Sequence, residues 1–165
     1  MNRRQLLTNG VAGVVAVVAA NAVPTRVQAD SGSNHNLVGS WLSTVTATNP
    51  PLGQFNNLIS FHPGGIVTES RRYSVPGTPL GNLLETTGHG AWVRRGGNTF
   101  EDFFRFLLQN ADTGAALGTD NIRLALTLNR LSDTLTGTFQ SEIKDTAGIV
   151  LFSVAGDYSA TPITV

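Results

Sequence analysis

Short runs of strand-forming residues, separated by tight turns, dominate the chain from Leu37 onward. The run Thr134–Lys144 shows the pattern best, because Leu135, Phe139 and Ile143 are separated by polar residues along it. A period of two places alternate side chains on opposite faces of a strand, one face dry and the other wet. No segment sustains the 3.6-residue period of an amphipathic helix. The sequence therefore predicts an all-β domain.

Eight strands are expected in this domain, with turns rich in glycine, proline and asparagine between them. They cover residues 37–48, 55–62, 66–73, 86–95, 99–110, 121–131, 134–144 and 149–160. The clearest hairpin turns at Pro63-Gly64-Gly65. The aromatic run in 99–110 could form a helical turn, but its flanking turns favour a strand buried on both sides. Residues 75–84, which contain two prolines and two glycines, are expected to form the longest loop, a candidate lid or rim.

The short connections also constrain the architecture. Consecutive antiparallel strands without helices form either a sandwich or an up-and-down barrel. Short links between neighbouring strands favour the meander, and therefore closure. Eight strands close around an interior that holds packed side chains or one small ligand. We expect an eight-stranded antiparallel up-and-down barrel, with a β-sandwich as the alternative.

The first 29 residues differ from the rest and are typical of an export signal. Arg3 and Arg4 precede an apolar stretch over 10–22, and small residues before Asp30 approach the A-x-A cleavage pattern. We expect cleavage after Ala29, a flexible tail at 30–36 and the barrel domain at 37–165. The stretch 2–7 (NRRQLL) resembles the bacterial twin-arginine signal, and an ordinary Sec signal is the alternative. The expected location is therefore periplasmic or extracellular, with no membrane span in the mature chain.

Composition excludes several function classes. The 165 residues include 11 basic and 11 acidic ones, and only 13% are charged. Loss of the signal would remove three arginines and leave a net charge of −3, which argues against binding to nucleic acid. Cysteine is absent, which excludes disulfides and thiolate chemistry. No histidine or carboxylate motif has metal-ligand spacing, so neither a metal nor a cofactor is expected.

Gly39-Ser40-Trp41 resembles the G-x-W motif of lipocalins and related calycins. In that family the tryptophan packs across one end of an eight-stranded barrel, and the barrel mouth takes an apolar ligand. The resemblance implies structural roles for Gly39 and Trp41. The chain departs from the family in having no clear second or third lipocalin motif, no C-terminal helix and no disulfide. It also looks like small secreted bacterial lipocalin-like barrels, and a resemblance to the allene oxide cyclase and dirigent barrels is the alternative.

Candidate ligand-binding residues follow from the strands of this expected barrel. The apolar walls would be Trp92, Phe104, Phe106, Leu126 and Phe139, and the polar points would be His89, Glu69 and Arg105. His89 lies between two glycines, which permit close approach of a bound molecule, although a hydrogen-bonded structural histidine is the favoured interpretation. Because His89 and Trp92 have opposite parity in one strand, one of them should face outward unless a glycine bulge intervenes.

The two charged candidates also have alternative interpretations. A buried Glu69 would need a partner among Arg71, Arg72 and Arg105, whereas a solvated strand face would need none. Arg105 sits in an aromatic run, where it could anchor an anionic head group or point outward. The adjacent acids Glu101 and Asp102 would diverge at a strand start, and we interpret them as part of the rim.

Three functions remain open for such a barrel. The first is an exported binding protein for a small apolar or amphiphilic molecule, and the second is a barrel cyclase or isomerase acting on a hydrophobic substrate. The third is a structural or interaction protein without a ligand. The sequence contains no nucleophile motif and no phosphate-binding loop, so no catalytic residue is assigned. An open, apolar interior would favour binding, a desolvated carboxylate pair would favour catalysis, and a packed interior would favour the third class.

Overall fold

The computed structural model describes residues 37–71, 74–78 and 81–164, without side chains for 74–78. The expected signal at 1–29 and tail at 30–36 lie outside these residues. Ten strands and no helix occur in the described part of the chain. They are β1 (Gly39–Asn49), β2 (Pro51–His62), β3 (Ile66–Ser70), β4 (Ser74–Thr78), β5 (Gly81–Glu85), β6 (Gly88–Gly96), β7 (Thr99–Asn110), β8 (Ala116–Asn129), β9 (Thr134–Lys144) and β10 (Val150–Pro162).

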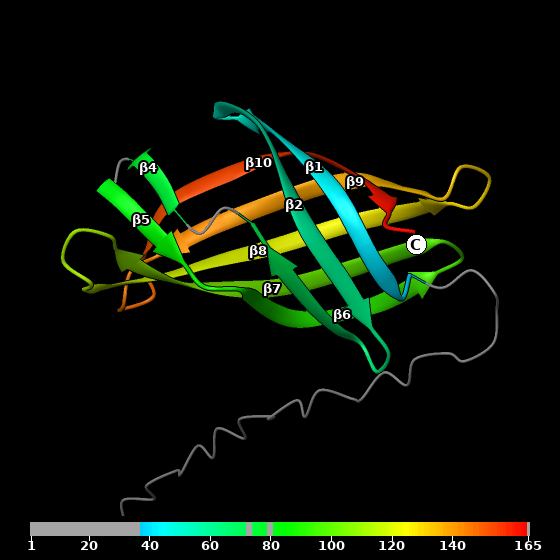
Figure 1. Cartoon of the computed structure of the whole chain (residues 1–165), viewed down its shortest axis with the longest axis horizontal. Coiled ribbons are helices and arrows are strands. Elements are labelled where there is room, and N and C mark those ends of the chain that lie inside the picture. Colours follow the sequence, from blue (N-terminus) through cyan, green and yellow to red (C-terminus); the bar gives the residue numbers. More distant parts are fainter. Residues whose placement is uncertain (1–36, 72–73, 79–80, 165) are drawn as a thin grey trace, which may run out of the picture.

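Eight of these strands close into an antiparallel barrel, as the sequence predicts (Figure 1). Their order around the barrel is β1, β2, β3, β6, β7, β8, β9 and β10, and β10 pairs back onto β1. The pairing of β7 with β8 completes the ring, so the sandwich alternative is excluded. In the described residues, no helix is long and apolar enough to cross a membrane.

The stretch 75–84 is not the irregular loop expected from its prolines and glycines. Its described residues belong to β4 and β5, which pair antiparallel, and Gly81 at the start of β5 has a φ of 88°. β7 extends beyond the end of β6. β5 pairs with the part of the β7 edge that β6 does not cover. Backbone pairing with this free edge gives the segment strand structure despite its composition. This pair of strands lies at one end of the barrel (Figure 1).

Strand ends deviate from the expected ones mainly next to turns. β2 begins at Pro51 and β8 at Ala116, several residues before the expected starts, because their partners β1 and β7 continue along them. The run 99–110 is a strand as predicted, but it is not buried on both sides. Phe103 faces outward between the guanidinium groups of Arg105 and Arg123, 5.8 and 4.9 Å from its ring centre. Leu107 is also exposed, so only one face of this aromatic run is buried.

The expected structural role of Trp41 is supported by its position. Trp41 lies near the start of β1, is 5% exposed, and donates a hydrogen bond from Nε1 to the carbonyl oxygen of Leu37 at 3.0 Å. Gly39, two residues earlier, has a φ of 148°, a conformation that favours glycine. This arrangement is consistent with a lipocalin-like barrel.

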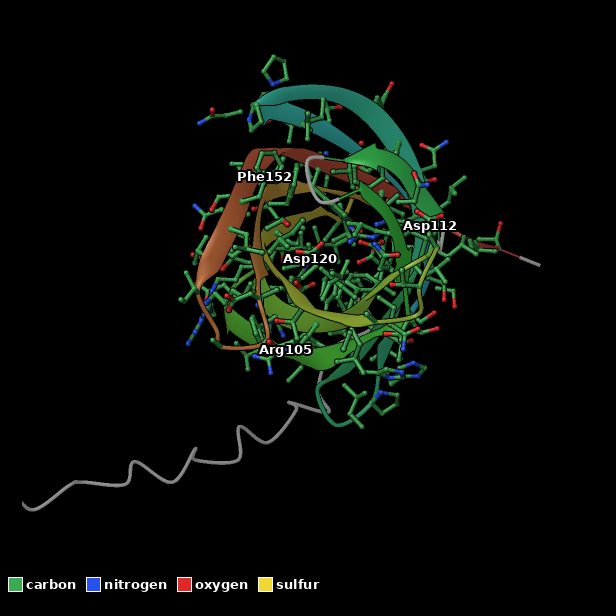
Figure 2. All side chains as sticks on the ribbon, turned by 90° about the vertical axis from the view of Figure 1, so that its left-hand side faces the viewer. Arg105, Asp112, Asp120 and Phe152 are labelled. Carbon is green, nitrogen blue, oxygen red and sulfur yellow. The ribbon has the colours of Figure 1, made fainter. Side chains whose placement is uncertain are left out.

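Side chains fill the barrel interior (Figure 2), and many of the largest buried ones are aromatic. Trp92 packs edge-on against Phe61 and Phe100, with ring centres 6.2 and 6.0 Å away. Phe104 and Phe106 make a similar contact at 5.7 Å. The rings of this second pair lie directly over Gly88, where an added Cβ atom would come within 2.8 Å of Phe106. Glycine at this point of β6 therefore makes room for two phenylalanines of β7.

Candidate functional site

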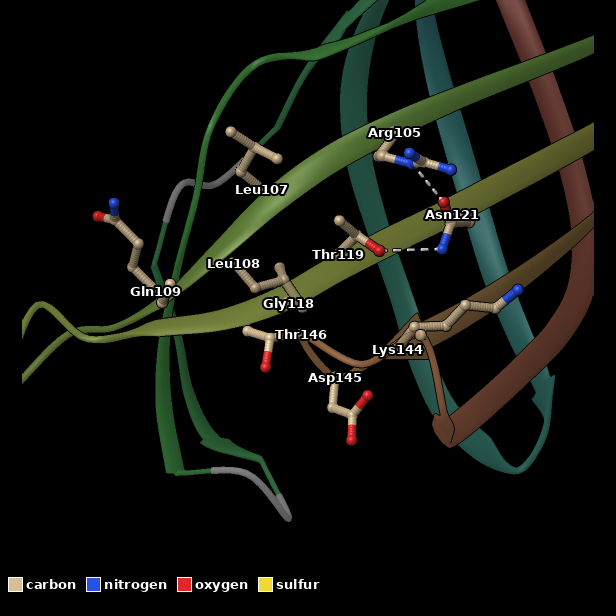
Figure 3. A pocket seen from close by; sticks show the side chains of 12 residues that line it. Arg105, Leu107, Leu108, Gln109, Gly118, Thr119, Asn121, Lys144, Asp145 and Thr146 are labelled. Atoms are coloured by element: carbon tan, nitrogen blue, oxygen red, sulfur yellow. Dashed lines mark hydrogen bonds between the residues drawn. The ribbon is translucent and has the colours of Figure 1, made fainter.

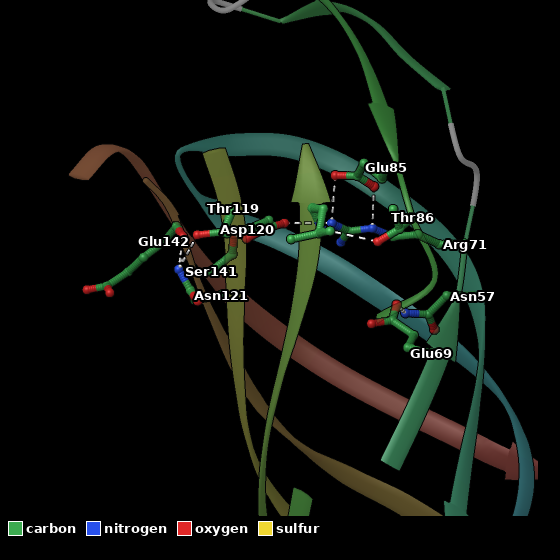
Figure 4. A network of polar contacts seen from close by, with 11 residues as sticks. Asn57, Glu69, Arg71, Glu85, Thr86, Thr119, Asp120, Asn121, Ser141 and Glu142 are labelled. Atoms are coloured by element: carbon green, nitrogen blue, oxygen red, sulfur yellow. Dashed lines mark hydrogen bonds and ion pairs between the residues drawn. The ribbon is translucent and has the colours of Figure 1, made fainter. Parts of the chain in front are cut away.

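A buried ionic cluster crosses the barrel interior beside β5 (Figure 4). Arg71 donates two hydrogen bonds to Glu85, at 2.7 and 2.8 Å, and a third to Asp120 at 2.6 Å. Asp120 also accepts from the hydroxyl of Ser141 at 2.6 Å. The Arg71 guanidinium lies over the ring of Phe106, 4.1 Å from its centre. One guanidinium thus ties β5 and β8 to the chain that follows β3, through short, charge-assisted hydrogen bonds.

Glu69 lies next to this cluster and is 1% exposed. Asn57 on the neighbouring strand β2 donates a hydrogen bond from Nδ2 to Glu69 Oε1 (Figure 4). Burial raises the pKa of Glu69 to about 7, because desolvation outweighs the favourable effects of Arg71 and Asn57. The nearby carboxyls of Asp120 and Glu85 add to this rise. The carboxyl of Glu69 therefore changes between its protonated and ionised forms near neutral pH.

Asp102, on β7, is the most isolated carboxyl of the interior. It is 5% exposed, and neither of its oxygens has a hydrogen-bond partner among the described residues. Burial raises its pKa well above the usual value, and repulsion from Glu69 raises it further. The backbone amide of Leu124 favours the charged form but does not reach hydrogen-bond geometry. Asp102 is therefore a buried carboxyl whose protonated form is favoured relative to an exposed aspartate.

Two further polar atoms face the interior without a partner in the described part of the chain: the hydroxyl of Tyr158 and Oδ1 of Asn57. Burial raises the pKa of Tyr158, and the charges of Glu69 and Asp102 raise it too. The nearby hydroxyl of Ser43, which donates a hydrogen bond to the carbonyl oxygen of Asn57, opposes this rise. Buried polar atoms are nearly always hydrogen-bonded in native proteins, so these atoms need an explanation.

Six of the eight predicted ligand-binding residues lie in the interior. The apolar set is buried there: Trp92, Phe104, Phe106, Leu126 and Phe139. Glu69 is buried with them, which excludes the alternative of a solvated strand face. Its hydrogen bond comes from Asn57, whereas Arg71, one of the partners considered, acts on it through charge alone.

His89 and Arg105 lie instead on the outer face, directly opposite each other on β6 and β7. The pairing of β6 with β7 is regular from His89 to Arg94, so no bulge resets the alternation and Trp92 takes the inner face. Arg105 donates from Nε to Oδ1 of Asn121 at 2.6 Å, at the edge of an open hollow of about 450 Å³ (Figure 3). Neither residue contributes to the interior cluster.

Sequence reasoning did not predict that Asp102 lies in the interior. Glu101 and Asp102 do diverge as expected, but only Glu101 faces solvent, where it pairs with Arg95 at 2.6 Å. Asp102 is not part of a rim, because it shares the parity of Phe100 and Phe104 on the buried face of β7. That shared parity is the signal that could have identified it. Asn57 and Tyr158 likewise share the parity of the buried residues Ile59 and Ala160, but only the closed barrel brings their strands around the same interior.

Among the described residues, no group of three or more histidine, aspartate or glutamate side chains is arranged to hold a metal ion. Comparisons of the chain with known protein families, curated proteins and solved structures gave no match. Fold and site together define an antiparallel β-barrel whose interior combines aromatic rings with buried, partly unpartnered acids.

Proposed function

We propose that the protein is an exported barrel that binds a small amphiphilic molecule in its interior. The observation that carries this proposal is that buried atoms on Asp102, Tyr158 and Asn57 have no partner in the described part of the chain. An unsatisfied buried polar group costs about 1–3 kcal/mol, so several within one barrel are a considerable burden on stability. A bound molecule that hydrogen-bonds to them would remove that cost.

The apolar part of the ligand would lie against the aromatic side of the interior. Trp92, Phe104 and Phe106 line it together with Leu126 and Phe139. Small-molecule sites typically combine such walls with a few polar groups that orient the ligand. These side chains lie against one another, and this packing by itself favours the third class, a protein without a ligand. The binding proposal therefore requires that the ligand displace some of them on entry.

Export is the second element of the proposal, and it rests on the first 29 residues. The arginine pair, the apolar stretch and the small residues before Asp30 support cleavage and transport out of a bacterial cytoplasm. The buried Trp41 in a closed barrel supports a relationship to lipocalin-like proteins. A periplasmic or extracellular binding protein unites these features.

Native mass spectrometry of the protein recovered from an exporting host tests the binding role. We expect a retained small molecule in the wild type, and its loss in Tyr158→Phe, which removes one hydroxyl. Titration with the neutral fluorescent probe N-phenyl-1-naphthylamine should show saturable binding that Trp92→Ala weakens. Thr136→Ala, on the exposed face of β9, is the matched control. No retained molecule together with no saturable probe binding would refute a ligand-binding role.

A barrel isomerase is the second candidate, and the buried Glu69 favours it. A carboxyl that exchanges its proton near pH 7 is suited to general acid–base catalysis. Ionised Glu69 would remove a proton from a carbon beside a carbonyl group, the electron pair would move to the carbonyl oxygen, and return of the proton to another carbon would shift the double bond. Deuterium exchange into cyclohex-3-en-1-one, followed by NMR, tests this activity. Exchange no faster in wild type than in Glu69→Gln would exclude it.

A further inference from the structure

The open hollow beside Arg105, of about 450 Å³, lies on the outer side of the barrel wall (Figure 3). Its walls come from β7, β8 and the turn that follows β9. Gly118 of β8 shapes it, because an added Cβ atom would come within 1.9 Å of the carbonyl oxygen of Lys144. Glycine at this point therefore lets the end of β9 lie close to β8, and this brings the following turn beside the hollow. A space of this size is enough for a small molecule.

A buried amide holds Arg105 at the edge of this hollow (Figure 3). The guanidinium donates from Nε to Oδ1 of Asn121 at 2.6 Å. Asn121 donates from Nδ2 to the hydroxyl of Thr119 at 3.1 Å and to the carbonyl oxygen of Glu142 at 3.3 Å. The Asn121 side chain is on the outer parity of β8, yet the residue is only 5% exposed. Because its amide is engaged on both ends, it fixes the direction of the guanidinium.

The remaining part of the Arg105 guanidinium has no counter-charge. Both of its Nη groups are N–H donors, and the bond to Asn121 uses neither of them. No acid in the described part of the chain forms an ion pair with Arg105. The other charged groups that line the hollow are engaged, since Lys144 pairs with Glu142 at 2.9 Å and Asp145 accepts from two backbone amides of its own turn. The hollow thus presents one oriented cation without a partner.

We propose that this hollow binds a small organic carboxylate, whose two oxygens accept from the Nη groups of Arg105. The planar fork of a guanidinium matches a carboxylate, and the two hydrogen bonds would be charge-assisted. Leu107, which lines the same hollow and is 57% exposed, would pack against the hydrocarbon part of the ligand. Asp145 also lines the hollow, and its charge disfavours a dianion such as a phosphate monoester. This site is separate from the proposed interior site and does not depend on it.

Titration with 4-methylpentanoate tests the site, and 4-methylpentanamide is the matched compound, because it has the same carbon skeleton without the charge. Proton–nitrogen correlation NMR at pH 7 follows the nitrogen-15-labelled protein recovered from an exporting host. We expect the carboxylate to shift the backbone amide signals of Leu107, Thr119 and Thr146 and the Nε–H signal of Arg105 in a saturable way. The neutral amide should bind at least about tenfold more weakly, because it cannot form charge-assisted hydrogen bonds.

Arg105→Gln should weaken carboxylate binding by about tenfold or more, since it removes the charge and the fork. Arg123→Gln is the matched control, because Arg123 lies on the other side of the Phe103 ring on the same outer face and does not line the hollow. Its affinity should stay within about twofold of the wild type, a difference well below the value of one hydrogen bond. Circular dichroism checks that both variants are folded.

Three results would overturn the inference. The first is the absence of saturable shifts in the hollow up to about 20 mM carboxylate, where a site of millimolar affinity would be filled. The second is equal affinity for the carboxylate and the amide, or an equal loss in both arginine variants. The third is a set of shifts confined to the interior, reported by the indole N–H of Trp92, which would reject the outer site while supporting binding inside the barrel.

Discussion

Replacing Glu69 with glutamine should make the protein more stable at alkaline pH and change little at acidic pH. Glutamine has nearly the same shape, keeps an oxygen that accepts from Asn57, and cannot ionise. In the wild type, the folded state holds the Glu69 proton up to about pH 7, whereas the unfolded state releases it near pH 4.5. The folded state therefore binds more protons between these values, and stability falls as the pH rises through that window.

The size of the effect follows from the same two pKa values. A difference of 2.5 units at about 1.36 kcal/mol each corresponds to roughly 3 kcal/mol. The full stability is present below pH 4.5, and the loss is complete above pH 7. Glu69→Gln should therefore exceed the wild type by up to about 3 kcal/mol at pH 8 and match it at pH 4. Asp102 and Glu85 have raised pKa values too, so the variant should retain part of the slope.

Urea unfolding of both proteins at pH 4, 6 and 8 provides the measurement. Glu101→Gln is the matched control, because Glu101 is 51% exposed and its surface ion pair with Arg95 contributes little. Its difference from the wild type should stay below about 1 kcal/mol at every pH. If Glu69→Gln is instead less stable than the wild type at pH 8, Glu69 is ionised and held by Arg71. A constant difference across the pH range would equally refute a raised pKa.

Three other substitutions test separate parts of the structure by denaturant unfolding. Tyr158→Phe should stabilise the ligand-free protein by about 1–3 kcal/mol, because it removes an unpartnered buried hydroxyl, and a loss of stability would mean that the hydroxyl has a partner. Trp41→Ala should cost about 3–5 kcal/mol, and a cost below about 1 kcal/mol would contradict its packing role. Arg71→Met should cost about 3–5 kcal/mol by leaving Glu85 and Asp120 without their cation, and wild-type stability would disprove the cluster.

The expected export signal makes a separate prediction, which can be tested through its paired arginines, Arg3 and Arg4. Peptide mapping of the secreted form should give an N-terminus at or near Asp30, and Arg3→Lys with Arg4→Lys should block export if the route is twin-arginine, since a Sec signal tolerates lysine. Full-length protein found only in the cytoplasm would contradict both the cleavage near Asp30 and export itself.

The sequence by itself determined the class of fold. The alternation of apolar and polar residues within runs such as Thr134–Lys144 is a local property, and so are the tight turns between the runs. Short links between antiparallel strands then leave few possible topologies. Parity also identified the apolar interior correctly, from Trp92 to Phe139, because burial of one strand face is written into each strand separately. Composition misled at 75–84, where pairing with the free edge of β7 overrode the prolines and glycines.

Only the closed barrel decided which polar residues share the interior. Asn57, Asp102 and Tyr158 lie on β2, β7 and β10, far apart in the sequence. Parity places each of them on the buried face of its own strand, but only closure of the barrel brings the three faces together. The choice between His89 and Trp92 likewise depended on the register of β6 against β7. A carboxyl's proton affinity depends on desolvation and on charges contributed by other strands, so it is a property of the assembled interior. The raised pKa of Asp102 and the pKa of about 7 for Glu69 could therefore be obtained only from the tertiary structure.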